Sequence, residues 1–108
     1  MSARSEYDAA YFTLLRAQEE RDHLLRYWEF LEAERDRLDD FAQVTHNATD
    51  ALPRALRRTV DATTKSLLEA IGRRRAAVLH ELSRMDDRLT SAEAFVLECE
   101  GEVQSLRI

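Results

Sequence analysis

The 108-residue sequence has few of the residues that interrupt helices, with two glycines and one proline. Glycine and proline are the least favourable residues in a helix interior, so their scarcity removes most breaks. Charged residues make up 34% of the chain, above the typical ~25% of globular domains. A chain of this length forms one domain. We therefore predict a single all-α domain of long, solvated helices.

Cysteine and long apolar runs are also scarce. The only cysteine is Cys99, so the chain cannot form an internal disulfide. No apolar run approaches the ~20 residues that a membrane span needs, and the first residues lack the apolar core of a signal peptide. We expect an intracellular, cytoplasmic protein without a membrane span.

Motifs that carry chemistry are missing as well. The sequence has no glycine-rich phosphate loop, no Cys-x-x-Cys pair and no catalytic triad pattern. The segment Glu20-Arg21-Asp22-His23 contains one Glu-x-x-His, but a di-iron bundle needs two such motifs and two further carboxylates. We interpret this segment as a solvated helix face, and we predict no enzyme, no cofactor and no metal site.

Seam residues recur at alternating three- and four-residue spacing, which is typical of helices that pack along a heptad seam. They predict helices at about 5–45 and about 52–89, joined by a polar turn at 46–51. The first seam comprises Tyr7, Ala10, Leu14, Ala17, Arg21, Leu24, Trp28, Leu31, Arg35, Leu38 and Ala42. The second comprises Leu56, Val60, Thr63, Leu67, Ala70, Arg74, Val78, Leu82, Met85 and Leu89. Its three successive four-residue steps from Ala70 to Leu82 indicate a stutter in the repeat.

Folding the chain about residue 48 places residue i opposite residue 96 − i. Leu14 then faces Leu82, and Asp39 lies near Arg57. The net charges of residues 1–52, 53–79 and 80–108 are −6, +5 and −4, which favours pairing within the chain or between subunits. This pattern predicts a long antiparallel helical hairpin of coiled-coil type.

In this register residues 90–108 have no partner within the hairpin. They carry an amphipathic stripe of Ala92, Val96, Cys99, Val103 and Leu106, which must be buried somewhere. Thr90-Ser91-Ala92-Glu93 fits a capping box that starts a third helix at about 91–107. The unbroken heptad spacing equally allows an extension of the second helix that pairs with another subunit in a dimeric bundle. Both alternatives stay open.

Two groups of apolar residues are therefore candidates for partner contacts. Tyr27, Phe30 and Phe41 project to a different face from the seam, and a helix that is apolar on several faces is normally buried by more than one neighbour. The stripe Val96, Cys99, Val103 and Leu106 forms the second group.

Basic residues supply two further hypotheses. Arg21 and Arg74 occupy seam positions at nearly the same level, and polar seam residues can set register and partner choice. A basic stripe also follows the second helix, and it is interpreted either as a solvated face or as a contact for an acidic partner. It comprises Arg54, Arg58, Lys65, Arg73 and Arg75.

Together these features predict a non-enzymatic coiled-coil interaction module, an assembly or adaptor subunit of an intracellular complex. Its partners would be proteins, in a homo-oligomer or a hetero-complex. One alternative is a small helical chaperone that shields an apolar client surface. Another is an accessory nucleic-acid-binding protein that uses segment 54–75, although the net charge of −5 disfavours nucleic acid.

Overall fold

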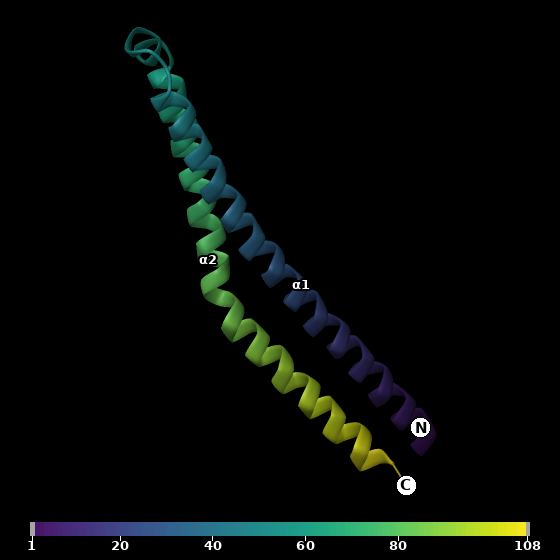
Figure 1. Cartoon of the computed structure of the whole chain (residues 1–108). Helices are drawn as coiled ribbons and strands as arrows, with labels where there is room; N and C mark the ends of the chain where they lie inside the picture. The colour runs from purple at the N-terminus through teal and green to yellow at the C-terminus, as the bar shows by residue number, and fades with distance from the viewer. Residues whose placement is uncertain (1, 108) are drawn as a thin grey trace. The chain divides into compact units, whose positions relative to one another are not determined.

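The computed structural model describes residues 2–107. Within this range the chain forms two helices and no strand: α1 spans Ala3–Asp50 and α2 spans Arg54–Leu106 (Figure 1). The all-helical hairpin is thus confirmed, whereas the third helix is wrong. The tail instead extends α2, which continues through the capping-box segment at 90–93 without a break. In the described part of the chain, neither helix has a stretch apolar enough to cross a membrane.

The start of α1 is set by a serine cap. The backbone N–H of Ser5 donates to Ser2 Oγ at 3.3 Å, and a side-chain acceptor of this kind satisfies a helix N–H that has no intrahelical partner. Because Ser2 supplies the cap, α1 begins at Ala3, two residues before the predicted start at about residue 5.

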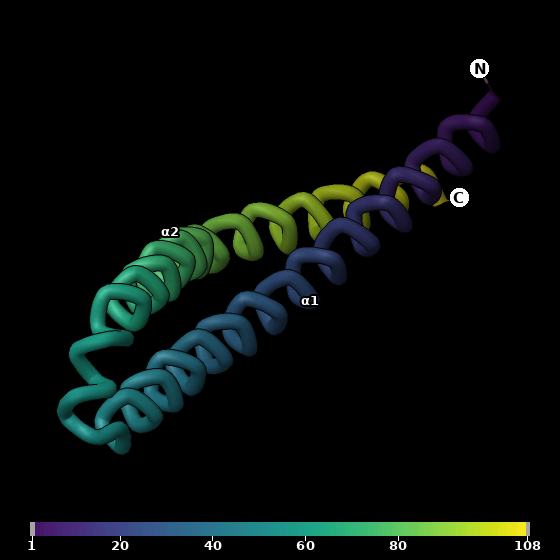
Figure 2. The backbone as a smooth tube through the Cα atoms, turned by 90° about the horizontal axis from the view of Figure 1, so that it is seen from above, coloured from purple at the N-terminus to yellow at the C-terminus, as the bar shows by residue number. Residues whose placement is uncertain are grey.

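The connection between the helices lies later than the predicted turn at 46–51. Thr45 and Thr49 stay helical, and their hydroxyls donate to the carbonyls of Phe41 and Thr45 at 2.8 and 2.9 Å. Polar side chains that are satisfied in this way do not need to leave the helix. Residues 51–53 make the connection (Figure 2), and the carbonyl of Pro53 accepts hydrogen bonds from the N–H groups of Leu56 and Arg57.

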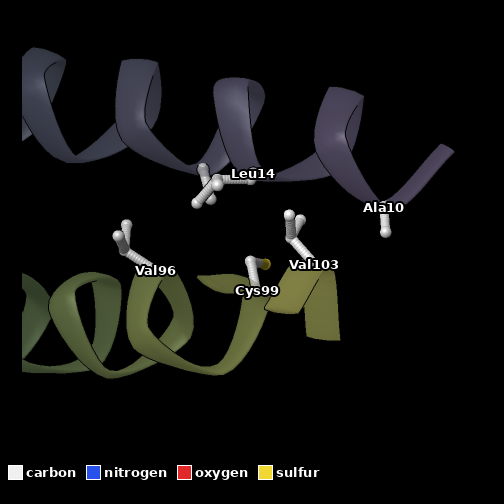
Figure 3. Packing of buried hydrophobic residues seen from close by; sticks show 6 residues of the cluster. Ala10, Leu14, Val96, Cys99 and Val103 are labelled. Atoms are coloured by element: carbon white, nitrogen blue, oxygen red, sulfur yellow. The ribbon is translucent and has the colours of Figure 1, made fainter. Parts of the chain in front are cut away.

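The chain divides into two compact units. The first comprises residues up to Glu29 together with residues from Arg84 onward, and the second comprises Phe30–Ser83. In the first unit, side chains from α1 and α2 point toward one another (Figure 3). Its core cluster consists of Ala10, Leu14, Ala17, Val96, Cys99 and Val103, with Tyr7 and Leu106 packed against it.

The register differs from the predicted one. Asp39 was expected near Arg57, but its carboxylate pairs with Arg75, 18 residues further along α2. Thr49 and Thr64 likewise share a hydrogen bond of 3.3 Å, where the rule of 96 − i would place Thr49 opposite Asn47. The tail of α2 therefore has a partner within the chain, because this shift brings it onto the first half of α1.

The seam of α2 is also corrected between residues 56 and 74. Five predicted seam residues are exposed: Leu56, Thr63, Leu67, Ala70 and Arg74. The residues that turn inward in the second unit are Val60, Thr64, Leu68, Ile71, Arg75, Val78 and Leu82. From Thr64 onward their spacing alternates between four and three residues, so the predicted stutter after Ala70 is wrong.

Adjacent leucines of α1 allow the packing to be tested. Leu14 is 9% exposed and Leu15 is 43% exposed. We expect Leu14→Ala to lower the free energy of unfolding by ~2–5 kcal/mol, because truncating a buried leucine loses contacts and leaves a cavity. Leu15→Ala should cost below ~1 kcal/mol in the dilute isolated chain. Urea unfolding followed by circular dichroism measures both, and equal losses would show that this seam is misplaced.

Candidate protein-interaction surfaces

The predicted aromatic residues lie outside the seam. Phe30 and Phe41 are each 50% exposed, and Tyr27 is somewhat less so. Phe30 and Phe41 belong to the second unit and Tyr27 to the first. The guanidinium of Arg37 lies 5.8 Å from the centre of the Phe30 ring, a distance typical of a cation–π contact. The second unit therefore presents two phenylalanines on one helix, with an arginine beside the first.

A shallow hollow of about 460 Å³ lies on the outer side of α1 in the second unit. It is lined by Glu34, Arg37, Leu38, Asp40, Phe41 and Val44. Four of these residues, Arg37, Asp40, Phe41 and Val44, stand at positions i, i+3, i+4 and i+7 of one helix, which is the set of four that receives a side chain from a neighbouring helix. The hollow therefore has the form of a socket for a helical partner.

Glu34 is the acidic residue that pairs with two arginines at this hollow. Arg37 Nη2 lies 2.7 Å from Glu34 Oε2, and Arg74 Nε donates to Glu34 Oε1 at 2.8 Å. The hydrogen bond from Arg37, followed by that from Arg74, lowers the pKa of the Glu34 carboxyl group. One carboxylate thereby joins a cation of α1 to a cation of α2.

The prediction that Arg21 and Arg74 both occupy the seam fails for Arg74. Arg74 does not occupy the seam; its side chain is exposed and pairs with Glu34 in the second unit. Arg21 lies in the first unit and pairs with Asp22 at 3.2 Å. In α2 the arginine that turns toward the seam at this point is Arg75, which pairs with Asp39 at 2.6 Å. Arg74 was misassigned because the predicted seam was out of phase by one residue at this point.

The tail stripe is placed in the core and not on a free surface. Val96, Cys99 and Val103 are buried against α1 in the first unit (Figure 3). Leu106 is partly buried and packs against the same cluster. Their assignment to a partner rested on the wrong register, in which this tail was left uncovered. Burial, followed by the charges of Glu98 and Glu102, raises the pKa of the Cys99 thiol, so the thiol stays protonated and poorly nucleophilic.

A second apolar surface was not predicted. Tyr11, Phe12 and Leu15 form adjacent exposed positions on α1 of the first unit, here named the Tyr11 patch, and Phe12 is 65% exposed. The ring of Tyr11 stacks on that of Tyr7, with centroids 6.2 Å apart. The signal was present in the sequence, since four of the five residues from 11 to 15 are apolar and cannot all face one seam.

The basic stripe is only partly available. Arg54, Arg58, Lys65 and Arg73 are exposed, whereas Arg75 is engaged with Asp39. Lys65 borders a hollow of about 670 Å³ that also includes the acidic residues Asp61 and Glu69. Charges of both signs therefore alternate along this face, which weakens any single-sign field for a nucleic acid.

Neither metal-ligating residues in the described part of the chain nor similarity to known proteins points to a function. Among residues 2–107, no group of three or more His, Cys, Asp or Glu side chains is placed to hold a metal ion. No protein-family model, no curated protein and no solved structure matches the chain. The surfaces described above are therefore the basis for inferring its function.

The lowered pKa of Glu34 predicts a defined pH dependence. A carboxyl group whose folded pKa lies below its unfolded value of ~4.3 stabilises the fold above that pH, and the effect is lost as the pH falls through the folded pKa. We expect Glu34→Gln to flatten the loss of stability below about pH 4.5. Urea titrations of both proteins from neutral to acid pH measure it. Glu19→Gln, on an exposed residue of α1, is the control, and parallel curves for wild type and Glu34→Gln would contradict the assignment.

Proposed function

We propose that this chain is a non-enzymatic helical interaction module that serves as an assembly or adaptor subunit of an intracellular complex. The observation that supports this proposal is how many large apolar side chains are exposed compared with how many hydrophobic residues are buried. Among the described residues, thirteen large hydrophobic side chains are at least 37% exposed, whereas ten hydrophobic residues are buried. Scattered exposed leucines are ordinary on protein surfaces, but adjacent exposed aromatic residues usually mark an interface.

The accessible surface supports the same proposal. The chain exposes 8033 Å², whereas a folded monomer of 12.5 kDa exposes ~6200 Å² on the usual scaling of surface with mass. Two helices that share one seam leave their other faces in water. A subunit that assembles with a partner covers such faces, and the hydrophobic contribution grows with the apolar area removed from water.

The Tyr11 patch is the first candidate contact for a protein partner. Aromatic residues dominate the energetically important positions of interfaces when they fill pockets of the partner. Phe12 projects furthest into solvent, and Tyr11 and Leu15 flank it one turn apart. A partner helix or groove that accepts Phe12 would cover all three side chains together.

We expect the double variant Phe12→Ser/Leu15→Ser to lose its stoichiometric complex. The measurement is the mass of the complex recovered with the tagged full chain from its native cells, by size exclusion with light scattering. Removing two apolar anchors from an interface typically costs several kcal/mol in affinity, enough to empty the complex at micromolar concentrations. The variant should keep the helical circular dichroism of the wild type.

The matched control is Arg16→Ser/Glu19→Ser, which changes two exposed polar residues of the same helix. It should leave the complex intact. Equal binding by the Phe12/Leu15 variant and wild type would contradict the patch. A heterogeneous set of unfolded clients in place of one stoichiometric complex would favour the chaperone alternative. Loss of binding with Arg54→Glu/Arg58→Glu, together with a steep dependence on salt, would favour nucleic acid.

A further inference from the structure

One stripe on α1 in the second unit has the same spacing in both directions, with its two charges exchanged when the order is reversed. Phe30, Glu34, Arg37 and Phe41 follow one another at steps of four, three and four residues. This spacing places all four on one helix face. A phenylalanine stands at each end, and opposite charges stand between them. We name these four residues the palindromic stripe.

A stripe of this kind is complementary to itself when a second copy runs antiparallel. Phe30 then faces Phe41 of the second copy, and Glu34 faces its Arg37. The two remaining contacts are the same pairs with the copies exchanged. This reciprocity, in which i contacts j and j contacts i, is the requirement of a two-fold interface, whereas a different partner protein imposes no such symmetry.

The shape of the surface agrees with this pairing. Phe41 is one of the residues that line the hollow on α1, together with Arg37, Asp40 and Val44. In the antiparallel pairing that sets Phe30 against Phe41, the side chain that points into this hollow is Phe30 of the second copy. Phe30 is itself half exposed. One helix therefore carries both the projecting side chain and the socket that receives it.

The charged groups in the middle of the stripe have capacity for a second set of contacts. The Glu34 carboxylate accepts from Arg37 and Arg74 of its own chain, but its two oxygens offer about four acceptor sites. The Arg37 guanidinium has five donor hydrogens. Its side chain is 60% exposed and that of Glu34 is 14% exposed, so Arg37 is the group that reaches across to the carboxylate of the other copy. Each copy can thus add a cross-subunit contact while it keeps its internal ion pairs.

We infer that a second copy of this chain docks on the palindromic stripe, antiparallel about a two-fold axis that lies between residues 35 and 36. The inference rests on the proposed function as an interaction module and names one of its partners. It places Phe30 of each copy in the hollow beside Phe41 of the other, with Glu34–Arg37 pairs at the centre.

Two single charge reversals test the pairing. In Arg37→Glu, each copy presents two acidic residues at the centre of the stripe, and in Glu34→Arg each presents two basic residues. We expect each variant alone to dimerise at least roughly tenfold more weakly than wild type, because like charges then face each other. An equimolar mixture of the two should recover the dimer, since every cross-subunit pair is then of opposite sign. Sedimentation equilibrium over a concentration series measures all three samples.

The mixture separates docking from folding defects. Each reversal also removes the internal Glu34–Arg37 pair, and that loss persists in the mixture, so recovery can come only from pairing between copies. Arg58→Glu is the matched control because it reverses an exposed charge of the same unit on α2, and it should dimerise like wild type. Phe41→Ser should weaken the dimer, whereas Leu56→Ser, on an equally exposed residue of α2, should not.

Three results would overturn the inference: a wild-type chain that stays monomeric at all concentrations, single reversals that dimerise as tightly as wild type, or a mixture that remains as weak as its components. Tight dimers of the single reversals would place self-association on another surface and leave the proposed function standing. A monomeric wild type that still forms the complex dependent on Phe12 would likewise refute only the second copy as partner. Loss of both would remove the proposed function as well.

Discussion

The constraint on which the structure depends is that each of two paired helices can bury only one face against the other. The core cluster of the first unit contains several small residues, such as Ala10, Ala17 and Cys99. Small side chains let two helices approach closely, but each removes little apolar area from water. Some large apolar residues, such as Met85, are buried, but others, including Phe12 and Phe41, stand on the remaining faces. Exposure of aromatic surface is therefore a consequence of the two-helix design.

Helical periodicity was enough to predict most of the seam residues of this fold, but it could not predict the register between the two helices. Every predicted seam residue of α1 is buried or half-buried, and so are those of α2 from Val78 onward. By the Thr49–Thr64 and Asp39–Arg75 contacts the register was wrong by 17 or 18 residues, a distance of about five helical turns. Such a shift returns the same stripe to the same face, so hydrophobic pattern alone cannot distinguish the two registers. The turn also had to be located, and Thr49 was placed in it although its hydroxyl donates to the carbonyl of Thr45 within α1.

Polar contacts supply the information that periodicity lacks. Three contacts within the second unit specify which parts of α1 and α2 face each other: Thr49–Thr64, Glu34–Arg74 and Asp39–Arg75. Exposed ion pairs of this kind contribute only ~0–1 kcal/mol each to stability. These contacts matter because they favour one register over another: a shift of five turns breaks all three of them together. The tail stripe inherited the register error, because it was assigned to a partner, whereas the Tyr11 patch was not predicted.

The distribution of apolar side chains also couples folding to association. A partner that binds the folded chain and not the unfolded one stabilises the fold by mass action, and the gain rises with its free concentration. In this chain the core cluster of the first unit contains mostly alanine, valine and cysteine, whereas Tyr11, Phe12 and Leu15 lie outside it. Much of the apolar area that is exposed in the folded chain therefore lies on the candidate association surfaces. Helices of this length draw most of their stability from tertiary packing and little from intrinsic propensity. The stability of the isolated chain should therefore depend on its concentration wherever a second copy is the partner, and on the partner's concentration wherever it is not.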